Sequence, residues 1–294
     1  MTLGNRFAGL PRQTVHRAVI ALTAGAALAL TSATTFAQVI LLPNATTYSQ
    51  DFNSLGLVTQ PWVDGTTLAG WYAGINANNT PDGNLRVTDG TEATPLSGLL
   101  NLGAAGDADR ALGSKATSNG NFANIAYGVL FQNNSGQDLL ITNVTYTGEL
   151  WRTNTGGNAE QWVTSYKVSP SLFTDVEPGG NSATANLGTF TAAPGSLNWT
   201  SPTNTPTGTA LNGNDPANRA TVTGDLNQVL LPGEYFMFRW VDTNLAGTDG
   251  YQGIEDLSIT FAAVPEPGTL ALLGIGLLPL AGALARKRRA AAAA

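Results

Sequence analysis

Four oxygen-bearing side chains stand at the two ends of the central part of the chain and could bind a hard cation. Asp51 and Asn53 open the first predicted strand, and Glu255 and Asp256 open the last. Calcium prefers a shell of carboxylate, amide and carbonyl oxygens. If the first and last strands are neighbours, these side chains form a structural calcium site. The alternative is that they cap strands and turn corners.

A second set of side chains could bind a sugar. Glu149 and Trp151 lie on one face of a predicted strand, and Trp162 follows across a glycine-rich loop. An exposed indole ring stacks on a sugar face while a carboxylate bonds the hydroxyls. The alternative is that both tryptophans pack in the core between sheets.

Paired carboxylates offer the remaining route to catalysis. The chain has no cysteine, and its only histidine, His16, precedes the central part. Ser-His-Asp chemistry, zinc sites of His and Cys, and imidazole acid–base catalysis are therefore excluded there. Glu149 with Glu160, or Asp242 with Asp249, could hydrolyse a glycoside, but no local pattern marks one as acid and the other as nucleophile. The sequence predicts that the protein is not an enzyme.

Four arginines adjoin apolar or acidic motifs and have a structural interpretation. They are Arg110, Arg152, Arg219 and Arg239. We expect some of them to pair with Asp242, Asp109 or Glu149 as anchors of the fold.

Short alternating or apolar runs position these residues, and no long amphipathic helix pattern occurs between residues 38 and 263. Gly, Asn and Pro clusters separate the runs, which is typical of strands joined by turns. The clearest runs are 125–132, 139–152, 161–169, 187–191, 235–242 and 257–261. We expect Asn133-Asn134-Ser135-Gly136 to link two of these strands as a hairpin loop.

Alternation assigns the faces of the strands. In 139–152, Val144, Tyr146 and Leu150 share one face, and Glu149 and Trp151 share the other. The run 235–242 is apolar on both faces. The sequence therefore predicts an all-β protein, a two-sheet antiparallel sandwich of jelly-roll type.

Residues 1–37 predict a secretion signal. Arg12 and Arg17 precede an uncharged apolar run, and small residues at positions 35 and 37 favour cleavage between Ala37 and Gln38 by signal peptidase after transport by the general secretion machinery. A permanent N-terminal anchor is the alternative.

The C-terminal residues have three parts in a fixed order. Pro265, Glu266 and Pro267 precede an apolar run over 269–285, which predicts a transmembrane helix. The basic cluster Arg286, Lys287, Arg288 and Arg289 follows, and residues 290–294 are alanines. Basic residues favour the cytoplasmic side, so the central part lies outside.

This order over residues 264–289 resembles the PEP-CTERM sorting signal. The resemblance implies recognition by a membrane-embedded exosortase, cleavage near Pro265, Glu266 and Pro267, and location first at the inner membrane and then at the cell surface or beyond. Such proteins typically belong to bacteria that make extracellular polysaccharide. A plain tail anchor is the alternative.

The central part, residues 38–263, resembles a β-sandwich module of many exported bacterial proteins. The motifs are Asp51-Phe52-Asn53-Ser54-Leu55, Gly70-Trp71, Arg110-Ala111-Leu112-Gly113, Tyr146 to Arg152, Gly213-Asn214 with Asn218-Arg219, Phe238 to Asp242 and Gly253-Ile254-Glu255-Asp256. The resemblance implies the fold and a surface role, and carries no catalytic residue. The predicted calcium ligands resemble the structural site of many carbohydrate-binding sandwiches.

Charge limits the partners. Of 14 basic and 20 acidic residues, seven basic and 19 acidic lie between residues 38 and 263, so this part carries about −12. Such a surface repels phosphate backbones and excludes nucleic acid as a partner.

Three functions are compatible with these observations. The first is a non-enzymatic surface or matrix protein with a structural or adhesive role, in contact with extracellular polysaccharide. The second is a carbohydrate-binding module with structural calcium. The third, least favoured, is a carboxylate-dependent glycoside hydrolase.

Overall fold

The computed structural model describes residues 37–75, 83–118, 122–177, 188–202 and 205–265. The predicted signal segment up to residue 36 and the sorting tail from Glu266 onwards, with its transmembrane helix, lie outside these ranges. Within them, no helix is both long and apolar enough to cross a membrane. Two 3-10 turns, η1 (Asn53–Leu55) and η2 (Gly195–Leu197), accompany the strands.

One layer, which we name sheet A, places the apolar strand predicted over 235–242 at its centre. β13 (Tyr235–Thr243) pairs with β7 (Asn124–Asn133) on one side and with β9 (Gln161–Ser169) on the other. The remaining strands are β1 (Val39–Leu41) and β3 (Trp71–Ile75), both on β7, and β10 (Thr191–Ala192) and β11 (Trp199–Thr200), both on β9.

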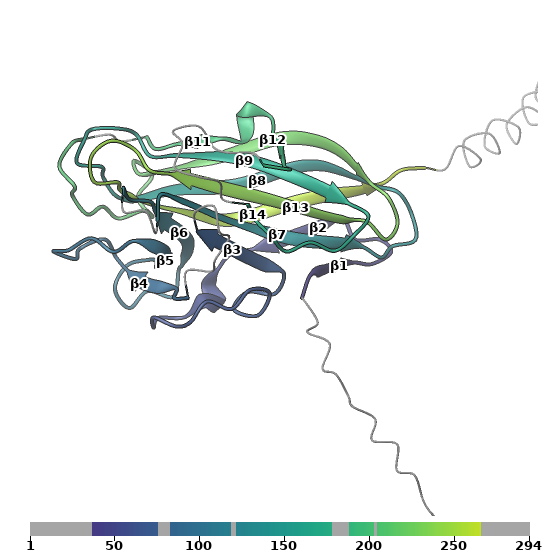
Figure 1. The fold of residues 1–294 in the computed structure, drawn as a ribbon, viewed down its shortest axis with the longest axis horizontal. Helices are drawn as coiled ribbons and strands as arrows, with labels where there is room; N and C mark the ends of the chain where they lie inside the picture. The colour runs from purple at the N-terminus through teal and green to yellow at the C-terminus, as the bar shows by residue number, and fades with distance from the viewer. Residues whose placement is uncertain (1–36, 76–82, 119–121, 178–187, 203–204, 266–294) are drawn as a thin grey trace, which may run out of the picture. The chain divides into compact units, whose positions relative to one another are not determined.

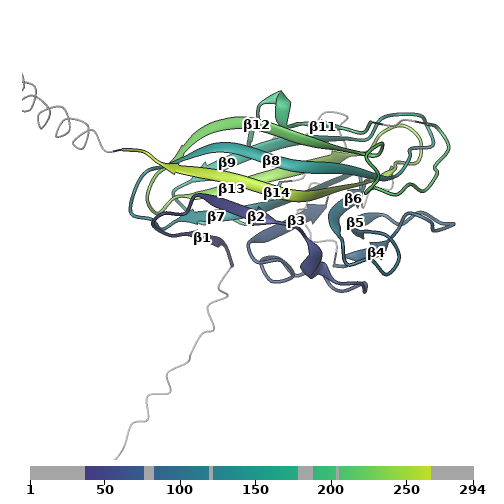
Figure 2. The ribbon, with the colours of Figure 1, turned by 180° about the vertical axis from the view of Figure 1, so that it is seen from behind.

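The second layer, sheet B, is built on the two longest strands. β8 (Leu139–Arg152) lies between β12 (Arg219–Leu230) and β14 (Tyr251–Ala263). The other strands are β2 (Thr47–Gln50), which pairs with β14, and the series β6 (Ala111–Lys115), β5 (Gly98–Leu102) and β4 (Arg86–Thr88). Figures 1 and 2 show the two sheets as layers from opposite sides, with β13 nearer the viewer in the first and β14 in the second.

The prediction of an all-β, two-sheet sandwich is confirmed. Antiparallel pairing dominates, but β1 pairs with β7 and β4 pairs with β5 in parallel. Both exceptions are three-residue strands at sheet edges, where a loop can bring the chain back in either direction. Of the run predicted over 187–191, the structure describes 188–191, and within these residues only Thr191 belongs to a strand, β10.

The predicted hairpin at Asn133–Gly136 is wrong. It connects β7 to β8, which lie in opposite sheets, so it is an arch between layers. The Asn133 side chain is buried and organises the arch, because its amide donates to Gln137 O and Leu230 O while its oxygen accepts from Ser135.

Aromatic side chains fill the space between the sheets, as alternation predicted. Val144, Tyr146 and Leu150 point into this core from β8. Trp240 of β13 lies at its centre, stacked on Trp71 at 5.8 Å and with Tyr146 edge-on at 5.5 Å. Aromatic burial of this extent supplies much of the driving force for folding.

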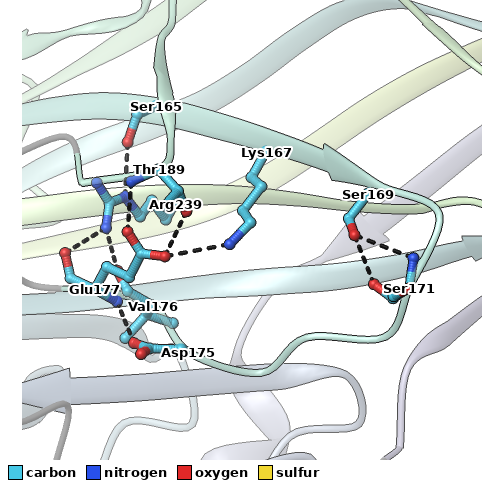
Figure 3. A network of polar contacts seen from close by, with 9 residues as sticks. All are labelled: Ser165, Lys167, Ser169, Ser171, Asp175, Val176, Glu177, Thr189 and Arg239. Carbon is cyan, nitrogen blue, oxygen red and sulfur yellow. Dashed lines mark hydrogen bonds and ion pairs between the residues drawn. The ribbon is translucent and has the colours of Figure 1, made fainter.

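A loop covers the outer face of sheet A, which explains why β13 is apolar on both sides. Phe173, Val176 and Phe190 pack on Met237 and Val241 there. Figure 3 shows how polar side chains fasten this loop.

Arg239 is the centre of that fastening. It is fully buried, its Nε donates to Ser165 Oγ at 2.7 Å, and its guanidinium bonds the backbone oxygens of Val176 and Glu177. The guanidinium carbon lies 3.8 Å from the centre of the Phe190 ring. Burial lowers the pKa of Arg239 to about 10, so the side chain stays charged at neutral pH.

Candidate functional site

Three of the side chains predicted to bind a sugar or calcium, Glu149, Glu255 and Asp256, meet at one end of sheet B. Arg219 of β12 is paired in register with Glu149 of β8, and Gly253 of β14 pairs with Glu149 from the other side. Strand register therefore brings residues from three distant parts of the sequence together.

Arg219 links the acids of this group, which we name the Arg219 cluster. Its guanidinium lies 3.4 Å from Glu149 Oε1, 3.1 Å from Glu255 Oε2 and 3.7 Å from Asp256 Oδ2. The prediction that an arginine anchors Glu149 is confirmed for Arg219. Arg110 instead donates to Asn101, and Arg152 donates to the backbone oxygens of Gly90 and Glu92.

Burial dominates the electrostatics of this cluster. It raises the pKa of Glu149 against the lowering effects of its hydrogen bonds and of Arg219. The pKa of Glu255 is also raised, first through burial and then through the neighbouring Asp109 and Glu149 carboxyls. One arginine thus serves several acids.

Trp151 is not open to a sugar. Its ring is 1% exposed, its Nε1 donates to Glu149 Oε2 at 2.9 Å, and it packs with Leu100, Leu102 and Tyr251 on the outer side of sheet B. Alternation placed it correctly on the outer face, but loops cover that end of the sheet.

Trp162 lies elsewhere, in the core between the sheets. It is 0% exposed and packs against Trp199 at 4.9 Å. The two predicted sugar-stacking rings therefore belong to separate clusters: Trp162 takes the alternative of packing in the core between the sheets, and Trp151 is buried under loops on the outer side of sheet B.

The predicted calcium ligands are brought near one another only in part. The predicted strand starts are wrong, because Asp51 follows β2, Asn53 lies in η1, and Glu255 and Asp256 lie within β14. β2 does pair with β14, and Asp51 and Asp256 line one hollow of about 330 Å³. Asn53 Oδ1 instead accepts from the Arg110 backbone N–H at 2.9 Å, and Glu255 faces Arg219. In the ranges that the structure describes, no three His, Cys, Asp or Glu side chains are grouped so that they could hold a metal.

The other three carboxyls of the predicted catalytic pairs form a second group, which is fully buried. The sequence indicated them only as possible pairs. Asp242, Asp249 and Glu160 are each 1% exposed, and Lys115 is 4% exposed beside them. Ser114 Oγ and Ala116 N donate to Asp242 Oδ2, while Asp242 Oδ1 has no hydrogen-bond partner among the described residues. We name these four residues the buried acidic cluster.

Burial shapes the protonation of this cluster. It raises the pKa of Asp242 to about 7 and that of Asp249 to about 9, in each case with a further contribution from the charge of Glu160. Carboxyls this far from solvent cannot reach a polymeric substrate, and Glu149 belongs to the other cluster, so neither predicted catalytic pair faces an open cleft.

The predicted processing sites lie at the limits of the described chain. Ala37 O accepts from Tyr72 Oη at 2.8 Å, and Gln38 Nε2 donates to Gln132 Oε1 at 3.0 Å. At the other end, β14 leads directly to Pro265, which is exposed. Glu266, Pro267 and the basic cluster Arg286, Lys287, Arg288 and Arg289 lie outside the described residues.

The fold and the tail together define a β-sandwich protein with a C-terminal sorting signal. Residues 263–289 match the PEP-CTERM protein-sorting motif. The motif implies processing by an exosortase and export to the cell surface. A comparison with curated proteins found no match.

Several solved structures are similar to the sandwich. The K2 cleaved adhesin domain of Lys-gingipain is 18% identical with a TM-score of 0.38, and the match covers 73% of this chain and 99% of that one. The K1 domain of Lys-gingipain from Porphyromonas gingivalis W83 is 19% identical with a TM-score of 0.36, over 75% and 100% of the two chains. The xylan-binding module CBM15 is 11% identical with a TM-score of 0.29, over 71% and 100%. At these TM-scores the likenesses carry no argument about function.

Proposed function

We propose that this chain is a non-enzymatic surface or matrix protein whose sandwich does structural or adhesive work in an extracellular polymer. The observation that carries the proposal is the sorting motif, joined to a sandwich whose candidate catalytic acids are buried or ion-paired. Signal peptidase removes residues up to Ala37, and an exosortase cleaves near Pro265, Glu266 and Pro267.

Fractionation with intact-mass measurement tests the sorting part. We expect the native protein outside the inner membrane, beginning at Gln38 and lacking the basic cluster that starts at Arg286. Cells without exosortase should retain the tail in the membrane fraction. Full-length mass in cells that contain the exosortase would contradict the proposal.

Complementation of a deletion strain tests the non-enzymatic part. The double variant Asp242→Asn and Glu160→Gln removes two of the three ionisable carboxyls of the buried acidic cluster, one from each predicted catalytic pair, while keeping side-chain size. We expect it to restore surface attachment as well as the wild type does. Failure of a folded variant to do so would favour a carboxylate-dependent hydrolase.

A second candidate function is a carbohydrate-binding module with structural calcium. It is favoured by one observation, namely that Asp51 and Asp256 line the same hollow. Calcium would take these carboxylates together with nearby hydroxyl, carbonyl and water oxygens. We expect millimolar calcium to raise the melting temperature relative to chelator, and Asp256→Asn to remove the effect. An equal melting temperature in both buffers would eliminate this candidate.

A further inference from the structure

Four adjacent strands of sheet B present hydroxyl and amide side chains on one outer face. Residues that are paired across adjacent strands form two rows, and each row runs from β12 through β8 and β14 to β2. The first row is Thr223, Thr145, Ser258 and Ser49. The second row is Asp225, Asn143, Thr260 and Thr47. Because side chains alternate along a strand, Val144 and Ile259 between the rows, and Val222 beside the first row, point into the core.

This surface, which we name the hydroxyl face, is open to solvent. Thr47, Ser49, Thr223 and Asp225 are exposed and the other members of the rows are half-buried. Loops cover the outer face of sheet A and the Trp151 end of sheet B. In Figure 2, β12, β8, β14 and β2 lie side by side towards the viewer.

The side chains of the hydroxyl face are ordered before a partner arrives. Thr145 Oγ1 and Thr223 Oγ1 are 2.8 Å apart, and Asn143 Nδ2 donates to Asp225 Oδ1 at 3.0 Å. Threonine is also stiff about its first side-chain torsion. Since each hydroxyl has one proton and two lone pairs, capacity remains for an outside partner. Little side-chain freedom is lost on binding.

A hollow continues the first row at the β2 edge. Ser49 and Ser258 belong both to that row and to the lining of the hollow of about 330 Å³ that contains Asp51 and Asp256. An extended partner that follows the row thus ends at two carboxylates, which can accept from hydroxyl groups.

Charge and composition narrow the chemistry of the partner. Asp225, Asp51 and Asp256 are the charges on the hydroxyl face and in its hollow, and the body as a whole is strongly acidic, so an anionic polymer is repelled. The two rows contain no aromatic or large aliphatic side chain, so an apolar peptide gains little. A neutral chain with many hydroxyl groups satisfies both conditions.

We propose that the hydroxyl face binds a neutral, hydroxyl-rich polysaccharide that lies across β12, β8, β14 and β2. The inference rests on the proposed role in an extracellular polymer and names the partner and the surface. Without ring stacking, each sugar contributes weakly, so long chains that meet many copies of the protein bind far better than short oligosaccharides.

Native gels cast with polysaccharide test this inference on the protein purified from its own cells, in whichever processed form it occurs there. The probes are dextran, mixed-linkage β-glucan and xyloglucan as neutral polymers, with alginate as the anionic contrast. We expect at least one neutral polymer to slow migration and alginate to have no effect. Retardation by none of the neutral polymers, or by alginate alone, would overturn the inference.

A matched pair of variants locates the surface. Thr145→Val with Thr223→Val removes two hydroxyls of the first row and keeps the β-branched shape. Thr191→Val with Thr200→Val makes the same change on exposed positions of β10 and β11 in sheet A. We expect the first pair to weaken binding at least fivefold and the second to leave it unchanged, with melting curves showing both folded.

Equal binding by both variants would overturn the assignment to the hydroxyl face. If the first pair fails to fold, Thr47→Val with Thr260→Val in the second row takes its place. Concentration-dependent self-association without polymer, lost in the first-row variant, would show that a second copy covers the face. Because the protein is tested in its native form, exosortase processing can fail while this inference stands, and the reverse.

Discussion

Replacing Asp242 by asparagine tests whether the buried acidic cluster limits stability at neutral pH. Asp242 has a folded pKa of about 7, raised first by burial and then by Glu160. In the unfolded chain the same carboxyl titrates near ~3.9. The folded state therefore keeps a proton that the unfolded state has already released. This stabilisation is complete below the unfolded pKa and is lost as the pH rises through the folded one.

The size of the effect follows from the width of that window. Between pH 5 and about pH 7, the folded state binds about one proton more than the unfolded state. Each of these two pH units therefore lowers the free energy of unfolding by about 1.36 kcal/mol. Between about pH 7 and pH 8, both states have released the proton and the free energy changes little. The free energy of unfolding should fall by about 2.7 kcal/mol from this residue alone. For a domain of this length, the melting temperature should fall by about 5–10 °C.

The Asp242→Asn variant should lose that dependence while keeping the local contacts. The amide oxygen can accept from Ser114 Oγ and Ala116 N as the carboxylate does. The other members of the cluster, Asp249, Glu160 and Lys115, are the same in both proteins.

Urea unfolding at pH 5, 6, 7 and 8 measures the difference. Between pH 5 and 7, we expect the free energy of unfolding of Asp242→Asn to fall less steeply with pH than that of the wild type. The difference should be about 1.36 kcal/mol per pH unit, which corresponds to one bound proton. Asp225→Asn, an exposed acid on β12, serves as the control and should follow the wild type. Parallel slopes for the wild type and Asp242→Asn would refute the reasoning.

Three further predictions concern packing. Arg239→Ala should lower the free energy of unfolding by about 3 kcal/mol in chemical denaturation, because several buried hydrogen-bond partners are left unsatisfied. Lys167→Ala, whose ion pair is partly exposed, should lower it by about 1 kcal/mol or less. Equal losses in the two variants would contradict this prediction. Gly148→Ala should lower the free energy of unfolding by about 1–3 kcal/mol, because the new Cβ would lie 2.2 Å from Trp199 Nε1. Gly195→Ala is the control and should be near neutral, because a Cβ there meets nothing within 4 Å. A neutral Gly148→Ala would show that the Trp199 ring can move. All six tryptophans are at most 3% exposed, so iodide should barely quench the native fluorescence, with or without polysaccharide, and strong quenching would contradict the fold.

Alternation was sufficient for the strands that carry the core. β8, β9 and β13 begin at the residues that their patterns predicted, since each has at least one continuous apolar face. β12 was not among the clearest strands. Its buried apolar residues Val222, Leu226 and Leu230 are four apart, because Gly224 and Gln228 stand at the positions between them and interrupt the apolar alternation.

For the candidate site, the sequence predicted only the strand face on which each side chain lies. Alternation placed Trp151 beside Glu149, but it carries no information about loops that return over a sheet. Gly213 shows the reason, because a Cβ there would lie 2.2 Å from Trp151 Nε1. The glycine lets its loop seal the ring from solvent. The buried acidic cluster was hidden for a similar reason, since Glu160 and Asp242 meet only through the pairing of distant strands.

The bulge in β12 limits pairing between copies of this protein at the edge of sheet B. β12 is the last strand of sheet B on its side, and an uninterrupted edge of this length would be a template for pairing with another copy. The bulge, with Asn227 in the left-handed conformation at φ 53°, divides that edge into two short stretches, and Asp225 adds a charge at the break. Under the proposed role, copies that are concentrated in an extracellular polymer would be protected from growing into fibres through their own backbones, and their cohesion would depend on that polymer.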